Sequence, residues 1–116
     1  MLQSANRLRH PAEVKRVRQE GQSWRHPLLI LLVQPNSLST SRFTFVASRF
    51  VGKAVRRNRA KRLLREVVRD HLPDIQPGWD CVMIARSGLS EASYSEVDTA
   101  VYQLLHRAKL LQKHHG

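Results

Sequence analysis

Residues 53–69 combine two patterns that together restrict the fold more than any other part of the chain. Eight of these seventeen residues are basic and one, Glu66, is acidic, so the segment supplies +7 of the formal charge of +11. Its apolar residues recur at helical spacing, at Ala60, Leu63, Leu64, Val67 and Val68. We therefore predict a long amphipathic helix that begins near Lys53, runs to about His71 and is ended by Pro73.

The polar residues of this helix share the face opposite the apolar stripe. At 100° per residue, that face consists of Asn58, Arg62, Arg65 and Arg69, widened on either side by Arg59 and Lys61. Most charged helical faces are solvated and mix signs in i,i+4 pairs, whereas the unpaired like charges here destabilise the isolated helix. Arginine outnumbers lysine six to two, and its planar guanidinium suits bidentate phosphate contacts. The face is therefore predicted to bind a nucleic-acid backbone.

The composition is that of one small globular domain. A chain of 116 residues with 41% hydrophobic and 25% charged residues can build a single core without metals or disulfides. The charge of +11 favours nucleic acid as the partner, with an anionic membrane surface as the second candidate. The single cysteine, Cys81, excludes an intramolecular disulfide and a zinc site of several cysteines, and is expected to be a small buried hydrophobe.

Apolar runs and turn residues predict the other elements. A short helix is expected over residues 11–21, with Pro11 in its first turn and Gly21 at its end. Strands are expected over residues 22–26, 28–33, 42–48 and 80–85, and a last helix over residues 93–113. The expected fold is α+β, a two-layer sandwich in the order α-β-β-β-α-β-α with a mixed sheet of about four strands. We expect one domain over residues 1–116, with its core at about 6–112 and a flexible tail at 113–116.

Residues 52–66, which read GKAVRRNRAKRLLRE, closely resemble the signature of the bacterial ribonuclease P protein subunit. Arg57-Asn58-Arg59 matches the arginine-asparagine-arginine core of that family, and Gly52, Ala54 and Val55 match the residues before it. The Lys-Arg-x-x-Arg pattern that follows the core is also present. The resemblance extends over about residues 6–112, from the basic lead Asn6-Arg7-Leu8-Arg9 to the closing helix.

The resemblance implies an accessory role in RNA cleavage. In that family a large catalytic RNA carries the magnesium ions and removes the 5′ leader from precursor tRNA, and the small protein assists it. This chain would accordingly be a subunit of an endoribonuclease with no catalytic residue, metal or cofactor of its own. Its partners would be the ribonuclease P RNA and precursor tRNA, without an obligate protein partner. Contacts with the catalytic RNA would be made by Lys53, Arg56, Arg57, Asn58, Arg59, Lys61, Arg62, Arg65 and Arg69.

The resemblance also implies a left-handed crossover and a leader cleft. The crossover leads from the third strand through the long helix to the last strand, where the general rule predicts a right-handed connection. The cleft lies between the first helix and the sheet, and this chain lacks the aromatic residues that the family usually has there. The usual Ser-Lys-Lys before the glycine turn is Ser48-Arg49-Phe50 here. Candidate leader contacts are Val14, Arg18, Leu32, Arg42, Phe43, Phe45 and Arg49.

Three other functions would also account for a strongly basic chain. A generic binder of structured RNA without a role in cleavage would carry the same basic helix. A DNA-binding protein would need a helix free to enter the major groove and usually a dimer seam, whereas the apolar stripe here belongs to one core. A membrane-surface protein would have Trp or Phe beside the basic face, and residues 60–69 have neither.

Two further sequence features limit the possible functions. The acidic residues show no metal-ligating spacing and the histidines are isolated, so no catalytic site is predicted. No apolar run approaches the roughly 20 residues of a membrane span, and residues 1–9 lack the apolar stretch of a secretion signal. We therefore expect a cytoplasmic protein with no membrane partner.

Overall fold

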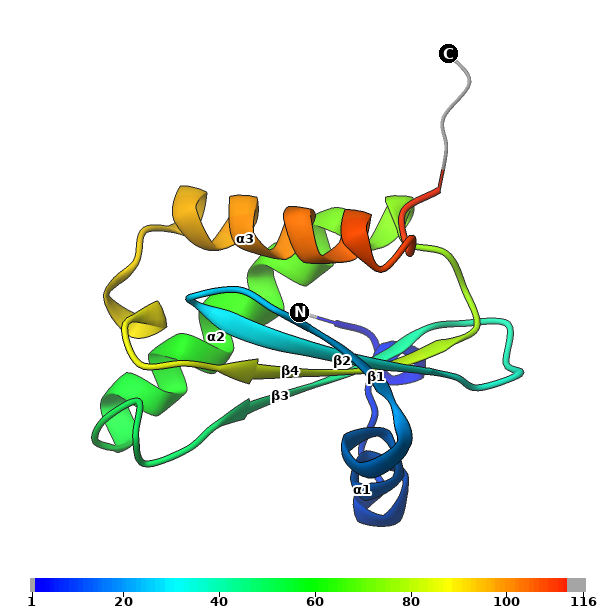
Figure 1. Ribbon diagram of the computed structural model, residues 1–116, viewed down its shortest axis with the longest axis horizontal. Coiled ribbons are helices and arrows are strands. Elements are labelled where there is room, and N and C mark those ends of the chain that lie inside the picture. Colours follow the sequence, from blue (N-terminus) through cyan, green and yellow to red (C-terminus); the bar gives the residue numbers. More distant parts are fainter. Residues whose placement is uncertain (1, 113–116) are drawn as a thin grey trace.

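Helices cover both faces of a four-stranded sheet in the computed structural model, which describes residues 2–112 (Figure 1). The helices are α1 (Pro11–Glu20), α2 (Ala54–His71) and α3 (Tyr94–Arg107). The strands are β1 (Gln22–Arg25), β2 (Leu29–Pro35), β3 (Arg42–Ala47) and β4 (Trp79–Ala85). Single turns of 3-10 helix are η1 (Ser4–Asn6), η2 (Leu72–Asp74) and η3 (Leu89–Glu91). The α+β class and the order of helices and strands predicted from the sequence are confirmed.

The sheet is mixed and has the strand order β1-β2-β4-β3. β2 pairs antiparallel with β1 and β4, whereas β3 runs parallel to β4 and is joined to it through α2. β3 is therefore an edge strand. The segment before α1 covers part of that edge: Arg7 pairs with Phe43 in an isolated bridge, and the Leu8 N–H donates to the Phe43 carbonyl oxygen at 2.9 Å.

The main core lies between the sheet and the pair α2 and α3. Because side chains alternate along a strand, Leu29, Leu31 and Val33 of β2 enter this core and are fully or almost fully buried. The apolar stripe of α2 packs there as predicted, with Leu64, Val67 and Val68 inaccessible to solvent. Cys81, Phe43 and Leu2 are buried in the same cluster, so the prediction for Cys81 is confirmed and the core extends to residue 2.

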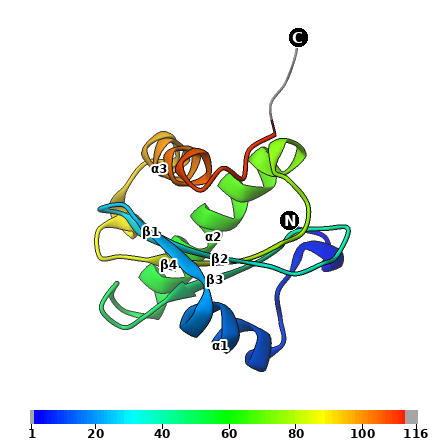
Figure 2. The ribbon, with the colours of Figure 1, turned by 45° about the vertical axis from the view of Figure 1, so that its right-hand side comes forward.

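α1 covers the opposite face of the sheet and adds a partial third layer to the two that were expected (Figures 1 and 2). The small cluster beneath it is built on Leu8, Val17 and Val82, with Leu32 packed against them. The run 28–33 was predicted to be a strand buried on both faces, and this second cluster explains why its alternate side chains are apolar as well.

The last helix ends earlier than its sequence pattern predicts. The prediction ran to residue 113, whereas α3 ends at Arg107. Lys109 has a positive φ of 60°, and the Leu110 N–H donates to the Leu105 carbonyl oxygen at 3.0 Å, which closes the helix. This turn places Leu110 in the core and lets Leu111 form a bridge with Ile75. The tail expected at residues 113–116 lies outside the described residues.

We predict that the buried stripe of α2 dominates its stability. Leu64→Ala removes a side chain that is 0% exposed, which should lower the free energy of unfolding by about 2–5 kcal/mol. Val55→Ala on the same helix removes a side chain that is 80% exposed and should change it by less than about 0.5 kcal/mol. Urea unfolding followed by circular dichroism measures both. Equal effects of the two substitutions would contradict the packing of α2.

Candidate nucleic-acid interface

The nine residues predicted to contact the catalytic RNA, from Lys53 to Arg69, all lie on α2 or at its N-terminal cap, Lys53, and we call them the basic face. Six of them are exposed, and Arg57, Lys61 and Arg65 are half-buried. The buried stripe of α2 fixes this arrangement, because a helix that places Leu64 and Val68 in the core must present the opposite side to solvent. The orientation predicted from helical periodicity is thus the one that the structure has.

Few carboxylates neutralise the basic face. Within residues 2–112 its ion pairs are Arg56 with Glu91 (3.2 Å) and Arg69 with Asp70 (3.6 Å). These side chains are 48–69% exposed, and such surface pairs contribute only about 0–1 kcal/mol. Arg59 instead donates from Nε to the carbonyl oxygen of Ser90 at 2.7 Å, which orients its guanidinium without neutralising it. Most of the positive charge of this face is therefore available to a partner.

Arg57 differs from its neighbours in its surroundings. Its Nε is buried and has no hydrogen-bond partner among the described residues. A buried donor without an acceptor costs about 1–3 kcal/mol. The Nε of Arg57 is thus an unsatisfied donor of the folded chain, and its burial keeps it from direct contact with a partner.

The turn before α2 requires a glycine at position 52. Gly52 has φ of +139°, which residues with a side chain rarely adopt, and a Cβ there would lie 2.7 Å from Cδ of Arg56. Its N–H donates to the Arg49 carbonyl oxygen at 3.1 Å. Gly52 therefore makes the turn that the sequence indicated and also leaves room for the side chain of Arg56.

A groove of about 480 Å³ extends the basic face toward the edge of the sheet. Its walls are the segment before α1, β3 and α2, and the residues that line it are Leu2, Arg7, Leu8, Arg9, Phe43, Thr44, Phe45, Lys61 and Arg65. Four of these residues are cationic and none is acidic. The Arg65 guanidinium lies 5.9 Å from the centroid of the Phe45 ring, in cation–π contact. The groove can accept a phosphate backbone and offers one aromatic ring.

Arg7 and Arg9 line the groove but are not among the contact residues predicted from the sequence. The sequence shows their charge, but the bridge between Arg7 and Phe43 that brings them to β3 joins residues 36 positions apart. Such a pairing leaves no periodic signal in either segment.

The seven candidate leader residues do not form one cleft. Val14 and Leu32 pack beside the small cluster under α1, and Arg18 lines a hollow of about 570 Å³ on that helix. Phe45 lies on the other face of the sheet, in the groove. Arg49 is exposed in the turn before α2. Phe43 is 2% exposed, so the expectation that its ring contacts the leader is corrected: it is a core side chain.

Arg42 is held by two carboxylates of the fold. Its Nε and Nη2 donate to the two carboxylate oxygens of Asp80 at 2.8 and 2.7 Å, and Nη2 also donates to Glu13 at 2.6 Å. Hydrogen bonds to Asp80 and then to Glu13 raise the pKa of Arg42. The side chains of Arg42 and Asp80 are only 19% and 10% exposed. Arg42 therefore ties α1 to β3 and β4, and its guanidinium is already occupied.

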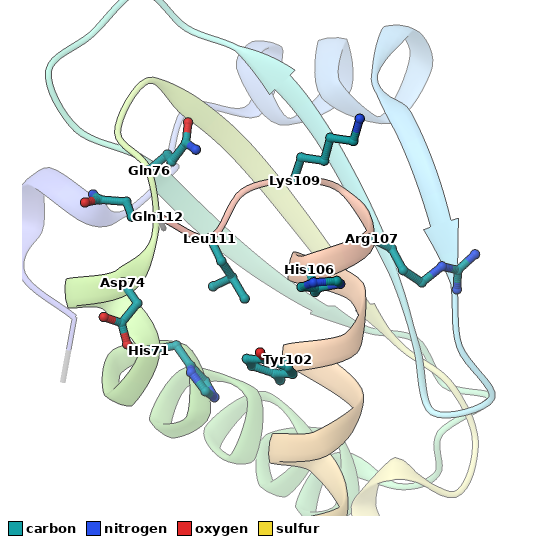
Figure 3. A pocket seen from close by; sticks show the side chains of 9 residues that line it. All are labelled: His71, Asp74, Gln76, Tyr102, His106, Arg107, Lys109, Leu111 and Gln112. Atoms are coloured by element: carbon teal, nitrogen blue, oxygen red, sulfur yellow. The ribbon is translucent and has the colours of Figure 1, made fainter. Parts of the chain in front are cut away.

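A second pocket lies at the C-terminal ends of α2 and α3 and shares no lining residue with the groove (Figure 3). It measures about 990 Å³ and contains the rings of His71, Tyr102 and His106. His71 Nε2 is 2.6 Å from Asp98 Oδ1, which joins the C-terminal end of α2 to the N-terminal half of α3. The residues that line this pocket include none of the basic face, so the two sites are separate.

Residues 2–112 contain no group of three or more histidine, cysteine or carboxylate side chains placed to hold a metal ion. Burial raises the pKa of the Cys81 thiol, which is fully enclosed. Within the same residues, none of the helices has the length and apolar character that crossing a bilayer requires.

Comparison with known proteins identifies the family. The sequence model of the Ribonuclease P family matches residues 2–109. The ribonuclease P protein component of Herpetosiphon aurantiacus is 41% identical over 109 residues, which cover 94% of this chain and 89% of that protein. That of a Roseiflexus species is 44% identical over 112 residues, which cover 96% and 92%.

Solved structures agree with this assignment. The ribonuclease P protein from Thermotoga maritima superposes with a TM-score of 0.79 at 34% identity, over 87% of this chain and 96% of that one. The Staphylococcus aureus ribonuclease P protein has the same fold, with a TM-score of 0.84 at 24% identity over 94% of this chain and 100% of that one. Sequence and fold together show that the chain belongs to the ribonuclease P protein family.

Proposed function

We propose that this chain, as the protein component of ribonuclease P, binds the catalytic RNA through the basic face of α2 and the adjoining groove. The observation that carries the proposal is the one-signed charge of the basic face, which the fold leaves largely exposed and largely unpaired. Phosphates would relieve the repulsion among these cations and release counterions, which makes binding favourable at low salt.

The 5′ leader of precursor tRNA would follow the hollow on α1. That hollow is lined by Arg9, Val14, Lys15 and Arg18, among others, and therefore offers cations beside an apolar surface. Arg9 also lines the groove beside α2. A leader on α1 would thus lie next to the catalytic RNA on α2, with Arg9 between the two. This arrangement supports a role in holding the substrate against the RNA that cleaves it.

In this proposal the RNA binds the magnesium ions and cleaves the phosphodiester bond. The protein binds no cofactor of its own. Four carboxylates have structural partners, which is consistent with this assignment. Glu13 and Asp80 hold Arg42, and Asp98 contacts His71. Asp70 accepts a hydrogen bond from the Tyr94 hydroxyl, which raises the pKa of Tyr94 to about 12. These groups join elements of the fold to one another.

Reconstitution tests the proposal. We expect the full chain, mixed with a bacterial ribonuclease P RNA at low magnesium, to restore cleavage of precursor tRNA and to cleave nothing without the RNA. Replacing Arg57, Arg59 and Arg62 with alanine should abolish the stimulation. The logarithmic salt slope of RNA binding should fall by about 2, because each lost phosphate contact contributes about 0.7–0.9.

A matched control removes the same charge elsewhere. Arg25, Arg107 and Lys109 lie on β1, at the end of α3 and in the turn after it, and all three are exposed. Their triple alanine variant should stimulate cleavage as the wild type does. Equal loss of stimulation in both triple variants would show that the effect depends on net charge alone. Tight RNA binding by the wild type without stimulation of any ribonuclease P RNA would support the alternative of a generic binder of structured RNA.

A second experiment separates the roles of Arg42 and Arg18. Arg42→Ala leaves the buried Asp80 carboxylate without its main partner and should lower the free energy of unfolding by about 1–3 kcal/mol. Arg18→Ala changes an exposed residue of the α1 hollow and should leave stability within about 0.5 kcal/mol. It should weaken binding of the reconstituted complex to precursor tRNA with a long leader, but not to tRNA with a one-nucleotide leader. Leader-independent weakening by Arg18→Ala would contradict the leader path.

A further inference from the structure

The two most exposed large apolar side chains among the described residues lie close together in the sequence. Phe50 is 84% exposed and Val55 is 80% exposed, at the turn before α2 and in its first turn. Apolar residues scattered singly over a surface are common and need no explanation. These two instead flank the start of the basic face, where an exposed aromatic ring can contribute to binding.

The turn that carries Phe50 is fixed by short-range contacts. The Phe50 N–H donates to Ser48 Oγ at 3.2 Å, and the Val51 N–H donates to the Ser48 carbonyl oxygen at 3.0 Å. Val51, the next residue, is 5% exposed and belongs to the main core. The backbone on both sides of Phe50 is therefore held while its ring stays in solvent. Binding through this ring therefore costs little conformational entropy of the backbone.

The charges around this turn select the kind of partner. The chain contains no acidic residue from Arg42 to Arg65, and Arg49 and Lys53 flank Phe50 within three positions. Unpaired nucleotides combine phosphates with flat apolar faces, and aromatic rings beside cations are how proteins bind them. A protein partner would need to bury the ring in a pocket while matching only positive charge.

We infer that Phe50 stacks on an unpaired nucleobase of the ribonuclease P RNA, with Arg49 and Lys53 against the adjoining phosphates. The inference rests on the proposed function, because it places the same RNA on the turn and on α2. In addition to the phosphate contacts of α2, the RNA would then make a stacking contact with this turn. Stacking does not release counterions, so its contribution should not depend on salt as the phosphate contacts do.

Equilibrium binding of the full chain to the ribonuclease P RNA, measured over a range of salt, tests the inference. Phe50→Ala should weaken binding at least about fivefold at every salt concentration and leave the logarithmic salt slope unchanged, since one stacked base contributes about 1–3 kcal/mol. Phe50→Trp should bind as the wild type does. Its additional tryptophan fluorescence, relative to the wild type, should be quenched by the RNA.

Two control variants define the comparison. Leu38→Ala changes a side chain that is 48% exposed on the β2–β3 turn and should leave RNA affinity unchanged. Phe50→Lys should bind more weakly than the wild type at high salt, where a further cation compensates least. All Phe50 variants should unfold at the wild-type urea midpoint, because an 84% exposed ring contributes little to the core.

The outcomes separate this inference from the proposed function. Wild-type affinity of Phe50→Ala, together with weak binding by the alanine variant of Arg57, Arg59 and Arg62, would overturn the stacking contact alone. Wild-type affinity of both would overturn the proposed RNA interface. If Phe50→Ala keeps its RNA affinity but loses binding to vesicles of anionic phospholipid, the ring belongs to a membrane contact and the inference is wrong.

Discussion

The self-repulsion of α2 is the constraint on which the rest of the fold depends. Eight cations within seventeen residues destabilise an isolated helix, and the two ion pairs of this face are too exposed to offset that cost. The compensation comes from the other side of the helix, where Ala60, Leu64, Val67 and Val68 are fully buried. Because the same burial fixes the direction of the charges, folding itself assembles the interface.

The second face of the sheet is held by a different kind of interaction. The apolar cluster under α1 has only three fully buried members, Leu8, Val17 and Val82. Arg42 supplements it by bridging Glu13 of α1 and Asp80 of β4 with charged hydrogen bonds of 2.6–2.8 Å. Such bonds fix direction as well as distance. The hollow on α1 therefore has a defined orientation relative to α2, which a leader of precursor tRNA held beside the catalytic RNA would require.

The sequence could predict what is periodic or local. The unmixed charge and the apolar spacing of α2 gave its bounds within one residue and its exposed face. The sequence could not predict contacts between distant segments. Examples are the contact of Arg42 with Glu13, 29 positions away, and the bridge that brings Arg7 to Phe43. The end of α3 was predicted too late because Ala108 and Leu111 continue the helical pattern, while the positive φ of Lys109 has no signal in a non-glycine residue.

The proposed RNA interface would combine contacts that differ in their response to salt and in their dependence on RNA structure. The cations of α2 can interact with any phosphate backbone, so they would give affinity and fast association without a fixed position along the strand. A ring can stack only where a base is unpaired. Phe45 in the groove and Phe50 on the turn lie at different places along the basic surface. Two such points would restrict how a folded RNA with unpaired bases can lie on α2, which charge alone cannot do.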